Sequence, residues 1–220
     1  DPWGDETDQD CDGEDGVYCE GDRDQDSAAG CNIIGGTLYL DGIANTDGLE
    51  SIRVINNGLD LRSTDLIDVD GLVNLQEVGG RFRLANNDYL LNVDGLASLQ
   101  TVGGHFEIND NMALTNLDGL SSLSSVGGEF WISNNDSITS LGDLPLLTYV
   151  NSLSVSGNDL LSNIDGLFSL TNVASMVTIS LHPELCWADA DELIAELVSV
   201  GSTHIGEFLN LNEGICDIDE

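Results

Sequence analysis

The chain has 220 residues, 41% of them hydrophobic, which is enough for a continuous core in one domain or in a short repeat array. Its 40 acidic residues face five arginines and no lysine, so the formal net charge is -35. A surface this negative makes nucleic acid and anionic membranes poor partners, and no apolar run is long enough to insert into and cross a membrane.

Residues 1–30 are acidic, rich in glycine and poor in large apolar side chains. Within them Asp8, Asp10 and Asp12 alternate before Gly13, a pattern that resembles the calcium loops of thrombospondin type 3 repeats and dockerins. Calcium prefers several hard oxygen ligands, so the resemblance implies calcium binding, although Cys19 stands where such loops carry their last glutamate. The alternative is a solvated acidic tail. The candidate calcium ligands are Asp8, Asp10, Asp12, Glu14, Glu20, Asp22, Asp24 and Asp26.

A repeat of about 24 residues occupies residues 31–181. Each copy has an Asp-Gly-Leu step, then a Val-Gly-Gly step or its equivalent, then an apolar-x-apolar triplet. Alternation in the triplet predicts a short strand with both apolar residues inward. The Leu-x-x-Leu-x-x-Val stretch before it fits either one helical turn or a second short extended segment. Stacking of such units predicts a β-rich repeat solenoid. The triplets are Leu38/Leu40, Leu59/Leu61, Phe82/Leu84, Phe106/Ile108, Phe130/Ile132, Leu153/Val155 and Val177/Ile179.

One polar position in the repeat is asparagine in the central copies and differs in the outer ones. An amide stacked inside the turn can bond neighbouring backbone groups, so we predict a structural asparagine ladder. The aspartate of each Asp-Gly-Leu step is expected to accept backbone N–H groups in a turn. The ladder positions are Asn87, Asn111, Asn135 and Asn158, with Thr64 and His182 at the two ends.

The repeat breaks at His182, and residues 182–220 are expected to cap the open end of the solenoid. Helical spacing of apolar residues predicts a helix over 189–199, and a final strand is expected near 208–211. Cys186 and Cys216 flank these elements and are predicted to pair. The other cysteines, at 11, 19 and 31, allow three pairings and leave one thiol over. Cysteines confined to the two ends are typical of an extracellular protein.

Together these motifs resemble the receptor L-domain type of leucine-rich repeat in bacterial surface proteins. The resemblance extends over residues 31–216 and depends on the Leu-x-Leu-x-x-Asn, Leu-Asp-Gly-Leu and Gly-Gly steps and on the cysteines that flank the last copy. It implies a right-handed solenoid with a parallel sheet on one face. It also implies an exported protein, secreted or attached to the cell surface, that serves recognition or adhesion and has no catalytic residue.

The middle residue of each triplet points outward from the predicted sheet. Three of the five arginines lie on this face, beside aromatic and acidic residues, in a chain that is otherwise almost wholly negative. The alternative to a binding role is that Asp60, Arg83 and Glu107 form a ladder of cross-strand ion pairs that offsets charge repulsion. We predict that the face contacts a protein or a glycan through Tyr39, Asp60, Arg62, Arg81, Arg83, His105, Glu107, Glu129 and Trp131.

Signatures of catalysis are missing from the sequence. The three histidines are scattered, there is no phosphate loop and no Gly-x-Ser-x-Gly, and the carboxylates are too numerous to single out a catalytic pair. We therefore expect no enzymatic activity and predict a calcium-stabilised recognition or adhesion module outside the cell. The alternative is a structural protein whose copies assemble into filaments or a surface layer, with Trp3 docking onto a neighbour and calcium joining carboxylates of two subunits.

Overall fold

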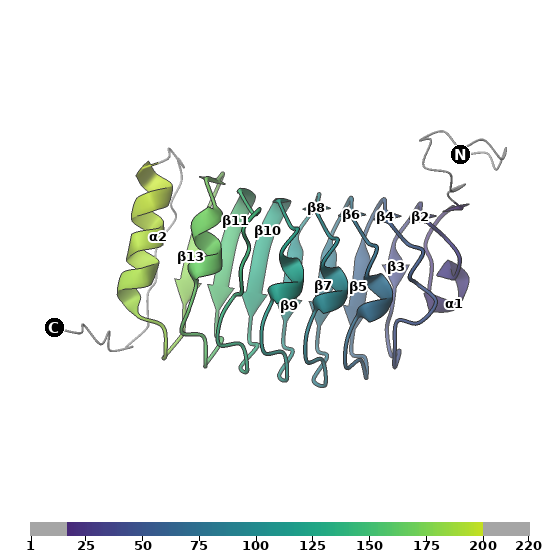
Figure 1. The fold of residues 1–220 in the computed structure, drawn as a ribbon, viewed down its shortest axis with the longest axis horizontal. Coiled ribbons are helices and arrows are strands. Elements are labelled where there is room, and N and C mark those ends of the chain that lie inside the picture. The colour runs from purple at the N-terminus through teal and green to yellow at the C-terminus, as the bar shows by residue number, and fades with distance from the viewer. Residues whose placement is uncertain (1–16, 200–220) are drawn as a thin grey trace.

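The computed structural model describes residues 17–199 and shows a solenoid of stacked turns (Figure 1). Within these residues each turn contributes parallel strands to one sheet, which has 13 strands in the described part of the chain. Short helical turns form a row in front of the strands in the view of Figure 1. The predicted fold class, a β-rich repeat solenoid with a parallel sheet and a C-terminal helix, is confirmed.

The strands form two ladders because each turn enters the sheet twice. β10 (Ser125–Ser133) and β11 (Tyr149–Ser156) run through both ladders and pair with each other in parallel. The ladder before the Gly-Gly step also contains β1 (Tyr18–Cys19), β2 (Ile33–Ile34), β4 (Val54–Ile55), β6 (Glu77–Val78), β8 (Thr101–Val102) and β12 (Asn172–Val173). The ladder of the predicted triplets contains β3 (Leu38–Tyr39), β5 (Leu59–Arg62), β7 (Phe82–Ala85), β9 (Phe106–Asn109) and β13 (Val177–Ser180).

Glycines stack at the corner between the two ladders. A Cβ on Gly103 would collide with the backbone carbonyl of Gly79, and a Cβ on Gly127 would collide with that of Gly103. Side chains at these positions would push neighbouring turns apart. The Val-Gly-Gly step is therefore a consequence of the close approach of one backbone to the next.

Four of the described Asp-Gly-Leu steps form 3-10 helices, so the stretch before the triplets that follow them contains both a helical turn and a short strand. The first step, at 47–49, forms a turn without a helix. The hydrogen-bond acceptor in these turns differs from the predicted one. Asn92 Oδ1 accepts the N–H of Asp94 at 3.0 Å, and Asn116 Oδ1 accepts the N–H of Asp118 at 3.1 Å. The N–H groups in the first turn of a helix have no acceptor within that helix. The N–H of the aspartate therefore bonds to the side chain two residues before it. The four helices are η1 (Asp70–Leu72), η2 (Asp94–Leu96), η3 (Asp118–Leu120) and η4 (Asp165–Ser169).

The inward residues form one continuous hydrophobic core that extends from Ala28 to Leu197. Within it the rings of Phe82, Phe106 and Phe130 stack, with centroids 4.7 Å apart in the first pair and 5.2 Å apart in the second. Full burial of a large apolar side chain contributes about 2 kcal/mol. Because equivalent side chains contact each other in successive turns, this core also holds the register of the sheet.

The predicted asparagine ladder is present, and its side chains have no exposed surface. Each Oδ1 accepts a backbone N–H of the preceding turn at 2.9–3.1 Å. Each Nδ2 donates to a strand carbonyl of that turn at 2.9–3.3 Å. Thr64 begins the ladder by donating its N–H, and His182 ends it with Nδ1 at hydrogen-bond distance from the backbone of Asn158. The ladder consists of Asn87, Asn111, Asn135 and Asn158.

His182 makes the last step of the ladder sensitive to pH. Its Nδ1 lies 3.2 Å from the backbone nitrogen of Asn158 and 3.1 Å from the Asn158 carbonyl oxygen, so the ring tautomer decides whether it accepts or donates. Burial lowers the pKa of His182 below its ordinary value of 6.5. The unfolded chain therefore takes up a proton more readily than the folded protein does. This contribution to stability is complete above pH 6.5 and is lost as the pH falls below that value. We expect the free energy of unfolding, measured by urea titration, to fall by at most about 1.4 kcal/mol per pH unit.

His182→Asn is the matched control, because asparagine can continue the ladder and does not titrate. The difference in unfolding free energy between the two proteins should change between about pH 7 and about pH 5, where histidine titrates. Asp70 and Asp136 have pKa values that are raised, first by burial and then by neighbouring carboxylates. They favour folding at low pH in both proteins, so their effect cancels in the difference. If the unfolding free energies of the two proteins changed with pH in the same way, the role of His182 would be contradicted.

The solenoid begins earlier than the repeat in the sequence. β1 pairs in parallel with β2, Arg23 forms a β-bridge with Leu38, and α1 (Gln25–Ala28) buries Ala28 in the core. Residues 17–30 belong to the acidic segment that was predicted to precede the repeat as a separate unit. In the structure they form the first turn of the solenoid.

At the other end, α2 (Trp187–Ser199) covers the last turn (Figure 1) and packs Ala190, Leu193 and Leu197 into the core. This confirms the helix predicted over 189–199. Cys186, which precedes α2, is disulfide-bonded. Cys216 and the strand expected near 208–211 lie outside the described residues, so the Cys186–Cys216 pairing and that strand stay predictions.

Candidate recognition surface on the sheet

The register of the sheet brings the outward residues of five successive turns into one row. Tyr39 pairs with Asp60, Asp60 with Arg83, Arg83 with Glu107, and Glu107 with Trp131. Neighbouring strands lie about 4.8 Å apart, so each of these side chains is next to the following one. We call this row and its flanking residues the sheet face: Tyr39, Asp60, Arg62, Arg81, Arg83, His105, Glu107, Glu129 and Trp131.

Two arginines converge on one buried carboxylate at the centre of the sheet face. The Glu107 side chain is only 6% exposed. Its Oε2 forms an ion pair with Arg81 Nη2 and lies 3.9 Å from Arg83 Nε. A buried carboxylate is costly unless a cation accompanies it, so Glu107 fixes where these two guanidinium groups lie.

Asp60 pairs along its own strand. Its Oδ1 accepts a hydrogen bond from Arg62 Nε at 2.6 Å, and Asp41 Oδ1 lies 3.8 Å from the same nitrogen. The bond to Asp60 is the main reason that the pKa of Arg62 is raised. Among the described residues Asp60 forms no ion pair with Arg83, so the predicted ion-pair ladder exists only on the side of Glu107.

A hollow of about 180 Å³ opens on the sheet face above β3, β5 and β7. It forms because small residues in the turns of β3 and β5 lie beside the long arginine side chains in the turn of β7. Sequence reasoning placed the arginines on this face and missed the hollow. The signal for it in the sequence was the small residue Gly58, which directly precedes β5 and lies next to Arg81. The hollow is lined by Tyr39, Asp60, Arg81, Arg83, Thr37, Asn57, Gly58 and Leu59.

The other half of the sheet face contains His105, Glu129 and Trp131. The Glu129 backbone N–H donates to His105 Nδ1 at 3.4 Å, and the Glu129 carboxylate lies 3.9 Å from that nitrogen. His105 is exposed and Trp131 is half-buried. None of these three lines the hollow. The predicted contact residues therefore share one face but form two groups, with Glu107 between them.

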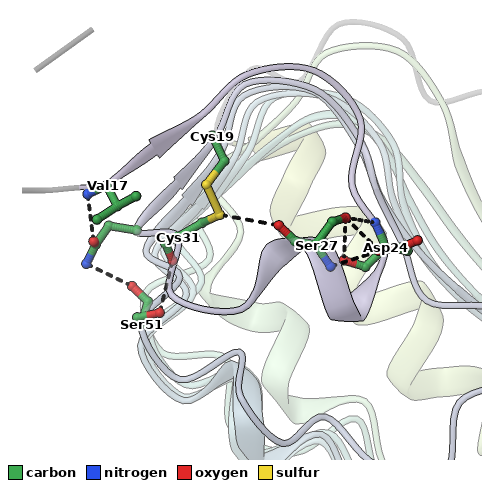
Figure 2. Close-up of a disulfide and its surroundings, with 7 residues drawn as sticks. Val17, Cys19, Asp24, Ser27, Cys31 and Ser51 are labelled. Atoms are coloured by element: carbon green, nitrogen blue, oxygen red, sulfur yellow. Dashed lines mark hydrogen bonds between the residues drawn. A yellow bond between two sulfur atoms is a disulfide. The ribbon is translucent and has the colours of Figure 1, made fainter. Parts of the chain in front are cut away.

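The described part of the acidic segment uses carboxylates to hold the chain. Asp22 Oδ1 accepts the N–H of Thr37 at 2.7 Å. Asp24 caps α1 by accepting the N–H of Ser27 at 2.9 Å and its hydroxyl at 2.6 Å (Figure 2). These bonds from Ser27 lower the pKa of Asp24. Glu20 and Asp26 are exposed.

Calcium binding stays a prediction. Asp8, Asp10, Asp12 and Glu14 lie outside the described residues, as does Trp3, which the assembly hypothesis requires. Within residues 17–199 no group of three or more His, Cys, Asp or Glu side chains is arranged to hold a metal ion.

Cys19 and Cys31 form a disulfide (Figure 2), which is one of the three pairings that the sequence left open. The bond joins β1 to the segment after α1 across a sequence separation of 12. A cross-link closing a loop of this size contributes about 2 to 3 kcal/mol. It therefore ties the first turn of the solenoid to the second. Cys11 lies outside the described residues.

Over residues 17–199, none of the helices has the length and apolar character needed to cross a membrane. Comparison of the chain with protein-family models, with curated proteins and with solved structures finds no match. The resemblance to receptor L-domains therefore stays a prediction from motifs.

Proposed function

We propose that this chain is a non-catalytic recognition module that binds a protein or a glycan outside the cell through the sheet face. One observation carries the proposal. The inward residues, the asparagines and the glycines of the repeat are used in contacts between turns, whereas the outward row changes chemistry at every turn from Tyr39 to Trp131. Side chains that differ within a constant framework are the ones available for a specific ligand.

Charge supports the same surface. The chain has five arginines and a net charge of -35, and three of those arginines lie on the sheet face: Arg62, Arg81 and Arg83. Arginine, tyrosine and tryptophan are the residues that contribute most often to binding energy at interfaces. All three types occur together here, and Tyr39 is 43% exposed.

The Cys19–Cys31 disulfide is compatible with an oxidising, extracellular location. We further propose that calcium binds the acidic segment through Asp8, Asp10 and Asp12, where it would reduce repulsion among carboxylates. Calcium would then stabilise the N-terminal end of the solenoid and leave the sheet face unchanged.

The double variant Arg83→Ala and Trp131→Ala is expected to weaken ligand binding by about 100-fold or more, because truncation of such side chains at an interface costs about 2 kcal/mol each. The Arg83 side chain is 30% exposed, and Trp131 is half-buried, so the core should stay intact. The wild-type chain is first screened on glycan arrays and against displayed extracellular proteins. The affinity of any ligand found is then measured by surface plasmon resonance.

The matched control is the double variant Arg53→Ala and Tyr89→Ala. It removes one guanidinium and one aromatic ring at other places, since Arg53 precedes β4 in the first ladder and Tyr89 is 64% exposed on a loop. Thermal unfolding followed by circular dichroism verifies that both variants are folded. Equal affinities of the two double variants would show that the sheet face is not the binding site.

A further inference from the structure

The hollow on the sheet face has a size and a lining that point to a particular ligand. Pockets for drug-sized ligands enclose about 300–1,000 Å³, whereas this one encloses about 180 Å³. It therefore fits one small group, such as a single sugar ring at the end of a chain.

Two guanidinium groups form one wall of this hollow. Arg81 is 48% exposed and Arg83 is 30% exposed, and both are held by the single carboxylate of Glu107. Two positive charges thus share one negative charge. Guanidinium groups prefer planar oxygen anions, which they bind with two parallel hydrogen bonds, so this wall fits a carboxylate.

The other lining residues offer groups of a different kind. Tyr39 presents a 43% exposed aromatic ring. Asn57 Nδ2 donates to Thr37 Oγ1 at 3.0 Å, and the side-chain oxygen of the same amide, Oδ1, can accept a hydrogen bond from a hydroxyl group. The Asp60 carboxylate is 18% exposed and accepts from Arg62, and its second oxygen can accept a hydroxyl as well. An aromatic ring and several acceptors suit a sugar ring, which has apolar C–H groups and hydroxyl donors.

We infer that the hollow binds a terminal sugar residue that carries one carboxylate, with the carboxylate against Arg81 and Arg83 and the ring against Tyr39. This inference rests on the proposed function and names its ligand class. Asp60 in the same hollow opposes a second anionic group on the ligand. The net charge of -35 opposes long polyanions in general. A single uronate at the end of a glycan meets both restrictions.

The test uses methyl β-glucuronide and methyl β-glucoside, which differ only in a carboxylate against a hydroxymethyl group. Affinities for the full chain are measured by NMR titration in about 0.5 M sodium chloride, where repulsion from distant carboxylates is screened. We expect the glucuronide to bind at least tenfold more tightly than the glucoside. Acetate, a carboxylate without a sugar, should bind at least tenfold more weakly than the glucuronide.

Variants test whether the preference for the glucuronide over the glucoside depends on residues of the hollow. Arg83→Met should abolish the preference for the glucuronide, whereas Arg53→Met, which removes the same charge elsewhere, should keep it. Tyr39→Ser alters an exposed side chain and should weaken binding of both glycosides by a similar factor. The thermal unfolding midpoint of each variant verifies folding. Equal affinity for the two glycosides, a preference that survives Arg83→Met, or acetate binding as tight as that of the glucuronide would each overturn the inference.

The same experiments separate this inference from the proposed function. If neither glycoside binds but a screened ligand still depends on Arg83 and Trp131, the sugar assignment alone is wrong. If no ligand depends on either residue, the recognition role of the sheet face is wrong as well.

Discussion

Replacing Asn111 with alanine is expected to lower the free energy of unfolding by about 2 to 4 kcal/mol. The side chain is fully buried. Its Oδ1 accepts the N–H of Asn87 at 3.1 Å, and its Nδ2 donates to the carbonyl oxygens of Leu84 at 3.1 Å and Asn109 at 3.0 Å. Alanine removes the acceptor of a buried N–H, the donor to two carbonyls and the volume of the amide. Urea unfolding followed by circular dichroism at neutral pH measures the loss.

Asn74→Ala is the control for this prediction. The Asn74 side chain is exposed and makes one hydrogen bond, from Nδ2 to the carbonyl of Glu50 at 2.8 Å, so its loss should change stability by no more than about 0.5 kcal/mol. Hydrogen exchange adds a local readout, because turns of a solenoid interact mainly with their neighbours. Amide exchange should accelerate most in β7 and β9, on either side of the lost bonds. Equal destabilisation by the two variants would contradict a structural ladder.

The asparagine ladder and the inward triplets could be predicted because they depend on the repeat alone. Residues 23 or 24 positions apart meet in neighbouring turns, as the bonds from Thr64 to Asn87 and from Asn87 to Asn111 show. Once the sequence indicates stacking, each repeated position must contact its own equivalent. The roles of Thr64 and His182 could be predicted in the same way, because they replace asparagine at the ladder position in the outer turns.

The start of the solenoid could not be predicted in the same way. Tyr18 and Cys19 lie in a segment whose composition is acidic and whose pattern has no repeat, yet β1 adds to the sheet beside β2. A strand at the end of a ladder can pair through its backbone N–H and C=O groups with almost any side chains, so its sequence need not follow the repeat. The Cys19–Cys31 bond was one of three pairings with equal support. Both features depend on tertiary contacts that local pattern does not reveal.

Details of the sheet face also exceeded what the sequence could predict. The register places Asp60 beside Arg83, but Arg62 on the same strand takes its carboxylate. Several oppositely charged groups lie within reach of one another, and side-chain conformation decides among them. The hollow depends in turn on where Arg81 and Arg83 are held by Glu107. The sequence thus predicts which residues share the face, whereas packing determines which of them form a site.

Gly95→Ala is expected to destabilise the protein by about 3 kcal/mol or more, although it adds only a methyl group. A Cβ at this position would collide with the carbonyl oxygen of Val69 and lie 2.8 Å from the Cα of Asp70. Both are backbone atoms of the preceding turn, so no side-chain rotation can relieve the contact. The turns would have to separate, which would stretch sheet and ladder hydrogen bonds at once. Thermal and urea unfolding measure the effect.

Gly42→Ala separates this steric cost from the conformational cost of replacing a glycine. Gly42 has a φ of +66°, and a Cβ there would meet nothing within 4 Å, so the substitution should cost only about 1 to 2 kcal/mol, from the left-handed backbone. If Gly95→Ala costs no more than this, the turns can separate without loss and the Asp-Gly-Leu step serves only to form a turn. If it costs more, the glycine sets the spacing of the turns, and the same spacing brings Arg81, Arg83 and Glu107 together on the opposite side of the solenoid.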